Sequence, residues 1–333
     1  MRLLSPTAAP SQAFLGWPVA TDPSTWSADV AVIGLPHSEP YARNPRPNDQ
    51  AQAPDAIRKC SGQVSDGQDH WDFDIAGDFS SVAPARCLDC GNVPWEGGTY
   101  DEHLARVNAL VRVLLRAGTQ IFVMGGDHGI TIPVLDALGE LKTPIHIVHI
   151  DAHLDWRQEV GGVRRGYSSP LYWASQKPWV SGMTQIGMRG TGSARRAELE
   201  AARAYRSQIF TAATVHAEGL DAALESIPSG SAVYVTIDAD GLDPTEMPGV
   251  MAPVPGGLRF AQIVPFLHTL AQKHRIVGFD LVEVAPSFDA SNRISCITAG
   301  RLIVNVLGAS WAPNGAFRRA PQGASLRPQS KPA

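Results

Sequence analysis

Three short clusters of acidic and imidazole side chains, each directly after an apolar run, carry the residue types best suited to chemistry. They read GGDH at residues 125–128, DAHLD at residues 151–155 and DADGLDP at residues 238–244. The apolar runs before them are typical of buried β-strands. In an open parallel sheet, ligands bind beyond the carboxyl ends of the strands, so all three clusters lie where a site is expected.

The spacing within these clusters brings several carboxylates toward one point. Residues two apart in extended chain face the same side, so Asp151, His153 and Asp155 can converge. Asp238 and Asp240 can converge for the same reason. Four such carboxylates without a counter-charge would repel one another strongly at neutral pH. Since no Lys or Arg lies within the three motifs, we expect divalent metal ions to supply the compensating charge.

Adding the imidazole of His128 gives a candidate ligand set of four Asp and two His. Mixed carboxylate and imidazole ligation suits Mn²⁺, and also Ni²⁺, Co²⁺ or Zn²⁺. Six ligands are too many for one catalytic ion that keeps open positions, but they suit two ions that share bridging carboxylates. A single Asp at a strand end is usually a cap, whereas three such clusters favour a binuclear site. The candidate ligands are His128, Asp151, His153, Asp155, Asp238 and Asp240.

The elements that position these clusters form an alternating pattern of strands and helices. Eight runs have strand character, and several are apolar almost throughout, as in strands covered on both faces. Helical periodicity appears between many of them, at residues 103–117, 131–141, 195–206 and 258–273. The alternation predicts βαβ units and a parallel sheet with helices on both faces. The expected strands are Asp29–Leu35, Arg86–Gly91, Gln120–Met124, Pro144–Asp151, Met183–Met188, Ser207–Thr211, Ala232–Asp238 and Arg275–Glu283.

Length and composition narrow the class of protein. The chain has 333 residues, of which 44% are hydrophobic, and shows no internal repeat or domain-sized linker. Its formal charge of −4 lacks the basic excess of a dedicated nucleic-acid binder. No apolar run reaches the roughly 18–20 residues that span a bilayer, and prolines interrupt residues 1–20, where a secretory signal would lie. With only four cysteines, we expect a reduced cytoplasmic protein that binds neither nucleic acid nor membrane.

The order of the motifs resembles the ureohydrolase family, which comprises arginases, agmatinases and their guanidino-acid relatives. The three clusters are followed by VEVAP at residues 282–286, and the resemblance covers roughly residues 29–310. It implies an α/β fold, a three-layer α/β/α domain on an eight-stranded, mainly parallel, arginase-like sheet, in agreement with the eight expected strands. It also implies two divalent ions per subunit, Mn²⁺ or Ni²⁺, and a trimer or hexamer, either a homo- or a hetero-oligomer. We expect an N-terminal extension at 1–28, a ureohydrolase domain at 29–311 and a disordered tail at 312–333.

The resemblance also implies a role for each residue of the site. The six candidate ligands would hold the two ions, with Asp151 and Asp238 bridging them. The metals would lower the pKa of a shared water, and the resulting hydroxide would attack the guanidino carbon of a linear guanidino compound. Asp155 would hold this hydroxide and pass its proton to the leaving amine. Glu283 would pair with the guanidinium nitrogens, and the products would be urea and an amine.

One position departs from the family pattern. Arginases and agmatinases often carry a His-Gly pair shortly after the DAHxD motif, where this chain has Arg165 and Gly166. Arg cannot shuttle a proton near neutral pH. Arg165 is therefore expected to bind a substrate carboxylate, to pair with an internal acid such as Glu159, or to narrow the pocket. The substrate stays open among agmatine-like compounds, guanidino acids, and N-alkylated guanidines or biguanides.

Two other functions compete with a guanidino hydrolase. The first is a low-activity or inactive ureohydrolase-like partner subunit of a hetero-oligomer, which the absent His favours and the complete ligand set disfavours. The second is a metal-dependent deacetylase on a related fold, which typically holds one zinc with fewer ligands. The four Asp and two His favour a binuclear hydrolase that acts on a small cationic guanidino substrate.

Overall fold

The structure, a computed structural model that describes residues 3–38, 41, 49–65 and 68–316, is built on one eight-stranded sheet. The strand order is β4-β1-β5-β10-β9-β6-β7-β8, and every neighbouring pair is parallel. All eight expected strands are confirmed. They are β1 (Val30–Leu35), β4 (Cys87–Asn92), β5 (Gln120–Gly125), β6 (Ile145–Ile150), β7 (Val180–Met188), β8 (Gln208–Thr211), β9 (Ala232–Asp238) and β10 (Arg275–Val282). A separate hairpin holds β2 (Trp71–Asp72) and β3 (Gly77–Asp78).

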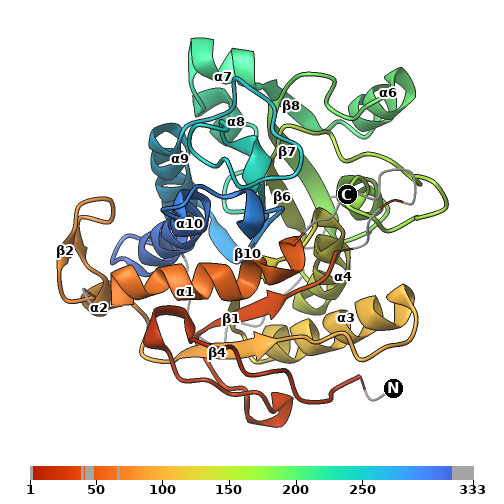
Figure 1. Cartoon of the computed structure of the whole chain (residues 1–333). Helices are drawn as coiled ribbons and strands as arrows, with labels where there is room; N and C mark the ends of the chain where they lie inside the picture. The colour runs from red at the N-terminus through yellow and green to blue at the C-terminus, as the bar shows by residue number, and fades with distance from the viewer. Residues whose placement is uncertain (1–2, 39–40, 42–48, 66–67, 317–333) are drawn as a thin grey trace, which may run out of the picture.

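Helices cover both faces of this sheet, so the expected three layers are confirmed (Figure 1). In β1, Val30 and Val32 point into one core, while Ala31 and Ile33 point into the other. This alternation is the two-residue period of a strand buried on both faces. The first core lies under α1 (Ala53–Ser65), α7 (Ala212–Glu218), α8 (Asp221–Glu225), α9 (Phe260–Lys273) and α10 (Ile294–Trp311). The second lies under α3 (Tyr100–Arg116), α4 (Thr131–Ala137), α5 (Pro170–Ser175) and α6 (Arg196–Ala204), and a short α2 (Phe79–Val82) follows the hairpin.

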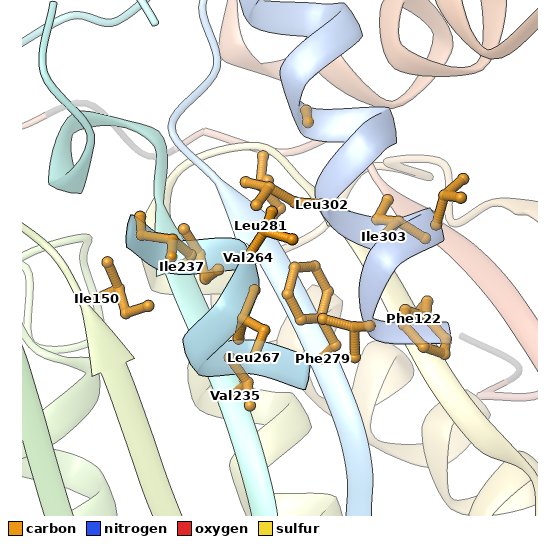
Figure 2. Close-up of a cluster of buried hydrophobic side chains, with 14 of the residues drawn as sticks. Phe122, Ile150, Val235, Ile237, Val264, Leu267, Phe279, Leu281, Leu302 and Ile303 are labelled. Carbon is orange, nitrogen blue, oxygen red and sulfur yellow. The ribbon is translucent and has the colours of Figure 1, made fainter. Parts of the chain in front are cut away.

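The sequence pattern did not predict α10, the longest described helix, because nearly all of its surface is buried. Leu302 and Ile303 of this helix pack into the core that also holds Phe279 of β10 (Figure 2). A helix without a solvent face has no polar stripe to reveal its period. By length and composition α10 could cross a membrane, so the expectation that no such segment exists is wrong. Because 78% of the helix is buried inside the protein, it is a core helix.

The four expected helices are confirmed with shifted ends. The helix expected from residue 103 begins at Tyr100, because Thr99 and Glu102 cap it reciprocally. The Glu102 backbone N–H donates to Thr99 Oγ1 over 3.2 Å, and the Glu102 carboxylate accepts from the Thr99 backbone over 2.7 Å. The helix expected at 131–141 ends as α4 at Ala137 and continues as a 3₁₀ turn, Leu138–Leu141.

The segment before β1 covers the outer strand β4. Ala8 and Val19 form single bridges with Asn92 and Asp89 of that strand. Such a cover occupies backbone groups that an edge strand would otherwise leave unpaired. The division of the chain at residues 28/29 and 311/312 stays a prediction, and most of the expected disordered tail, residues 317–333, lies outside the described residues.

A buried ion pair joins α1 to this edge of the sheet. Arg58 of α1 and Asp89 of β4 are fully buried, and two hydrogen bonds of 2.8 and 2.9 Å join the guanidinium to the carboxylate. Asp89 also accepts a hydrogen bond from the backbone N–H of Phe14 over 2.9 Å. One carboxylate thus ties the N-terminal segment, α1 and β4 together.

We predict that Asp89→Asn lowers the apparent free energy of unfolding by about 3 kcal/mol or more, because Arg58 then loses its buried counter-charge and keeps only the half-exposed carboxylate of Asp55, 3.6 Å away. Chemical denaturation followed by circular dichroism measures this loss. The matched control is Arg86→Gln, which breaks an ion pair with Asp29 where the Arg86 side chain is 59% exposed. The control should leave the free energy of unfolding nearly unchanged, because solvent screens an exposed ion pair. Equally small losses in both variants would contradict the structural role of the buried pair.

Candidate metal centre

The three clusters and a further acidic residue meet at one edge of the sheet. β5, β10, β9 and β6 are neighbours and run in the same direction, so their carboxyl ends lie side by side. His128 and Asp151 lie just after β5 and β6. Asp238 ends β9, and Glu283 follows β10. The parallel sheet therefore gathers residues that are far apart in the sequence, as the rule for strand ends predicts.

Tight turns after the strands let these residues approach one another. His128 begins a 3₁₀ turn, and the Asp127 carboxylate caps the turn by accepting a backbone hydrogen bond over 2.9 Å. Gly241 lies so close to the loop after β6 that a Cβ would meet the Asp151 backbone nitrogen at 2.8 Å. A glycine at this position allows the close approach. Asp240 can therefore reach the same point as Asp151.

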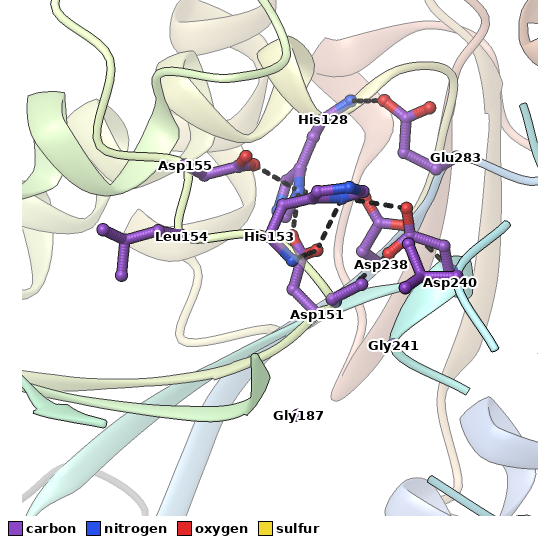
Figure 3. A network of polar contacts seen from close by, with 12 residues as sticks. His128, Asp151, His153, Leu154, Asp155, Gly187, Asp238, Asp240, Gly241 and Glu283 are labelled. Atoms are coloured by element: carbon purple, nitrogen blue, oxygen red, sulfur yellow. Dashed lines mark hydrogen bonds and ion pairs between the residues drawn. The ribbon is translucent and has the colours of Figure 1, made fainter. Parts of the chain in front are cut away.

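One group of acids surrounds the imidazole of His128, which is fully buried (Figure 3). His128 Nδ1 lies 3.0 Å from Asp155 Oδ2. The same nitrogen lies 3.3 Å from Asp238 Oδ2 and 3.3 Å from Asp151 Oδ2. The structure thus brings an imidazole nitrogen and three carboxylates to one position, from the ends of three neighbouring strands.

A second group forms around His153. Its Nδ1 lies 3.0 Å from Asp240 Oδ2 and 3.4 Å from Asp151 Oδ1. Asp151 belongs to both groups and turns one oxygen toward each imidazole, as Figure 3 shows. A carboxylate that faces two positions in this way can bridge two ions. All six expected ligands therefore lie together, in two groups that share Asp151.

The charges in this cluster are poorly compensated by the protein alone. Burial and the nearby charges of Asp240 and Asp151 raise the pKa of Asp238 well above its usual value. Burial lowers the pKa of His153, but hydrogen bonds to Asp151 and Asp240 raise it to about 12. The pKa of Asp151, in contrast, is held well below its usual value by His149, His128 and His153 against the effect of burial, so the imidazoles compensate part of the acidic charge.

The donor set fits divalent cations. His128 Nδ1 is buried beside three carboxylate oxygens and makes no well-directed hydrogen bond within the described part of the chain. Its other nitrogen, Nε2, lies 2.9 Å from the Thr236 hydroxyl, which can hold the ring with Nδ1 directed at the acids. An imidazole nitrogen and carboxylate oxygens that converge on one point are ligands of Mn²⁺ and related ions.

His149 belongs to the centre but was not among the expected residues. Its Nε2 lies 2.8 Å from Asp151 Oδ2, and its Nδ1 lies 3.1 Å from the side-chain nitrogen of Gln185. Because Gln185 donates to Nδ1, the proton of the neutral imidazole is on Nε2 and is donated to Asp151. Gln185 is fixed in turn by the Ser207 hydroxyl over 2.8 Å. The spacing of His149, on β6, and Asp151, just after it, was a usable signal, since residues two apart at a strand end face the same side.

Glu283 is held beside the centre by two contacts. Its Oε1 accepts the backbone N–H of His128 over 2.8 Å, and its Oε2 accepts a hydrogen bond from the Gln50 side chain. Gln50 is buried although it comes from the loop after β1, and nothing in its immediate sequence indicated this contact. Burial and the charge of Asp127 raise the pKa of Glu283 well above its usual value. A carboxylate so placed is a ready acceptor for cationic N–H groups.

Two of the acids sit on strained backbone. Asp155 has a φ of +52° and Glu283 has a φ of +67°, in the left-handed region that residues other than glycine rarely adopt. Each such residue costs on the order of 1–3 kcal/mol, and such residues cluster at functional sites. The fold therefore maintains the position of these two carboxylates against a local cost.

Arg165 lies apart from the two groups of ligands. Its guanidinium carbon is 5.7 Å from the centre of the Trp173 ring, and its Nη1 is 3.9 Å from the Asp101 carboxylate. Within the described residues, Asp101 and not Glu159 is its acidic neighbour. Its backbone oxygen accepts a hydrogen bond from the Tyr100 hydroxyl over 3.0 Å. Its expected contact with substrate stays a prediction.

Comparison with known sequences places the whole sheet and its centre within one family. Residues 28–308 match the family described as the arginase family. N(1)-aminopropylagmatine ureohydrolase of Thermus thermophilus is 35% identical over 233 residues, which cover 68% of this chain and 75% of that protein. Agmatinase of Sodalis glossinidius is 30% identical over 309 residues, which cover 91% of this chain and 94% of that protein.

Solved structures agree with this placement. Proclavaminate amidino hydrolase from Streptomyces clavuligerus superposes with a TM-score of 0.78 at 28% identity, covering 92% of this chain and 98% of that one. A hypothetical agmatinase from Burkholderia thailandensis gives a TM-score of 0.75 at 27% identity, covering 93% and 96%. The chain therefore belongs to the arginase family and is a ureohydrolase, a hydrolase that acts on linear amidines.

Proposed function

We propose that this ureohydrolase cleaves the guanidino group of a small cationic substrate into urea and an amine, with two divalent metal ions in its centre. The observation that carries the proposal is the shared Asp151, which joins the His128 group and the His153 group. One ion would be held by His128, Asp151, Asp155 and Asp238, and the other by His153, Asp240 and the two bridging acids Asp151 and Asp238. When bound, such ions supply a water of lowered pKa as the nucleophile.

Asp155 is the residue that we propose to move a proton. Burial and the charge of Asp151 raise the pKa of its carboxyl above the usual value. The Asp155 carboxylate also lies 3.0 Å from His128 Nδ1, at the position proposed for one ion, so a water held there is within its reach for proton transfer. Asp155 would accept the proton of the attacking water and deliver it to the nitrogen of the leaving amine.

Glu283 is the residue that we propose to orient the guanidinium. Each carboxylate oxygen has two lone pairs, so the contacts with His128 and Gln50 leave an acceptor position on each oxygen. A planar guanidinium can donate to both oxygens at once, which fixes the plane of the carbon under attack. Orientation of this kind lowers the entropic part of the barrier.

The names of the relatives support a substrate with a guanidino group, but they differ in the rest of the substrate molecule. The names of the compared proteins include agmatinase, aminopropylagmatine ureohydrolase and proclavaminate amidino hydrolase. The alternative of a weakly active partner subunit rests on Arg165 in place of the family His. The complete acid cluster favours the enzyme. The choice of Mn²⁺ over Ni²⁺, the trimeric or hexameric assembly and the cytoplasmic location stay predictions.

We predict that Asp151→Asn and His153→Ala each abolish urea release and lower the metal content, while circular dichroism shows an unchanged fold. Asp151 contributes one oxygen to the His128 group and one to the His153 group, and His153 is the imidazole around which the second of these groups forms. Urea is measured after incubation with arginine, agmatine, guanidinobutyrate, guanidine, dimethylguanidine and a biguanide, with Mn²⁺ or Ni²⁺. Asp221→Asn, at an exposed position on α8, is the control and should keep full activity. Turnover retained in both site variants would contradict the assignment.

We also predict that His149→Ala weakens metal binding by about 10–100-fold, because Asp151 loses the donor that orients it. His149→Gln, whose amide can donate in the same direction, should recover part of the affinity. Titration with Mn²⁺ followed by calorimetry measures both constants. Unchanged affinity in His149→Ala would show that Asp151 needs no such support.

A further inference from the structure

Arg189 lies just after β7, and its half-buried side chain extends to the turn that follows β9. In the strand order, β6 lies between β7 and β9, so these two strands are not paired with each other. The Arg189 side chain therefore supplies a direct connection between them, beyond the carboxyl end of β6. The DAHLD motif begins at that same end of β6.

All three nitrogens of this guanidinium donate to backbone oxygens. Nη1 donates to the oxygens of Gly187 and Gly241, over 3.2 Å in each case. Nη2 donates to the oxygens of Asp240 and Leu242, the latter over 3.2 Å. Nη2 and Nε both donate to the oxygen of Val254, over 2.7 and 3.0 Å. Because the guanidinium is planar and offers its donors in a fixed arrangement, it determines where the turn lies relative to β7.

The turn that Arg189 holds carries one of the candidate metal ligands. Asp240 lies in a 3₁₀ turn, and its Oδ2 lies 3.0 Å from His153 Nδ1. The Asp240 Oδ1 accepts the backbone N–H of Ala152 over 3.2 Å. Since the peptide group is rigid, a fixed Asp240 carbonyl also restricts the direction in which its carboxylate points.

The same guanidinium joins the two segments between which the Asp151 backbone lies. A Cβ on Gly187 would meet the Asp151 backbone oxygen at 2.8 Å, and a Cβ on Gly241 would meet the Asp151 backbone nitrogen at 2.8 Å. Figure 3 labels both glycines beside the acid cluster. Nη1 of Arg189 donates to the oxygens of both, so one nitrogen connects the two segments.

The charge of Arg189 and its hydrogen bonds have opposite consequences for a bound cation. Burial opposes the positive charge of this side chain, and the charges of Asp240 and Asp151 favour it. Removal of a positive charge near a cation site would by itself tighten the binding of the cation. Loss of the hydrogen bonds would instead release Asp240 and weaken the binding. The sign of the change in metal affinity therefore reveals which effect is larger.

We propose that Arg189 is a positioning residue for the metal centre, which sets the place of Asp240 and thereby the affinity of the His153 group for its ion. The inference rests on the proposed binuclear centre and adds to it a residue that is not a ligand. The His128 group depends on Arg189 less, because no hydrogen bond of the Arg189 side chain reaches a residue of that group.

The first arm of the experiment measures metal binding by titration of the chain with Mn²⁺ in calorimetry. Asp240→Asn identifies the binding step that belongs to the His153 group. Arg189→Gln should weaken this step at least about tenfold and change the other step much less. Arg189→Lys keeps the charge but loses the planar set of donors, so it should weaken the same step. Unchanged or tighter binding at this step in both variants, or an equal loss at both steps, would overturn the proposal.

Arg106 is the matched control, because its buried guanidinium also donates to backbone oxygens, those of Pro94 and Pro6, over 2.9 Å. Arg106→Gln should lower the free energy of unfolding, since it leaves carbonyl oxygens without their donors, and should leave both metal constants unchanged. An equal loss of metal affinity in the control would show a general effect of removing a buried arginine and would overturn the positioning role. Arg189→Lys and Arg106→Lys are the milder pair for the same comparison if a Gln variant does not fold.

The second arm measures how urea release depends on Mn²⁺, with the guanidino compound that the unaltered chain cleaves fastest. Arg189→Gln should need at least about tenfold more Mn²⁺ for its half-maximal rate. Its KM for the guanidino compound at saturating Mn²⁺ should stay unchanged, because the hydrogen bonds of Arg189 do not reach Glu283. A raised KM with an unchanged Mn²⁺ requirement would count against the proposal. Failure of the proposed function has a different result, since the unaltered chain would then bind fewer than two ions or release no urea.

Discussion

The mutual repulsion of buried carboxylates is the interaction on which the rest of this structure depends. Asp151, Asp155, Asp238 and Asp240 are almost fully buried at one edge of the sheet, where the imidazoles of His128, His149 and His153 lie against them. Burial and the charges of Asp240 and Asp151 raise the pKa of Asp238 well above its usual value, the direction in which like charges act on one another. A parallel sheet is well suited to impose this arrangement, because the ends of adjacent strands cannot separate without breaking the ladder between them. Burial of apolar side chains in the two cores on either side of that sheet offsets the free energy needed to bring the acids together.

The residues around the acids keep them in place and directed at the same two positions. His149, with Gln185 behind it, orients Asp151, and the backbone of His128 fixes Glu283. Asp155 and Glu283 keep positive φ angles that only a rigid surrounding can maintain. Positions maintained in this way have little freedom to relax when the centre is empty or when a charge changes. This rigidity is what an arrangement of ligands needs if it is to favour a particular pair of ions.

Much of the fold and the site could be predicted from the sequence, because both depend on local patterns. Each buried strand is a short apolar run, and the clusters lie at the carboxyl ends of β5, β6 and β9 as expected. The extended chain assumed within the clusters is not found, because Asp240 lies in a 3₁₀ turn and Asp155 has a left-handed φ. The missed features have no such pattern. Helix α10 is buried nearly all round, so it has no amphipathic period. Gln50 reaches Glu283 across 233 residues of sequence, and only the folded chain brings them together. The placement of Arg165 over Trp173 likewise depends on the path of a loop.

We propose that six side chains form one centre for two divalent ions. The most direct test is the metal content of the purified chain after saturation with Mn²⁺ and removal of loosely bound ions, measured by mass spectrometry of the elements against protein concentration. We expect two ions per chain, held with an affinity that resists gel filtration. A folded protein that retains one ion or none under these conditions would contradict it.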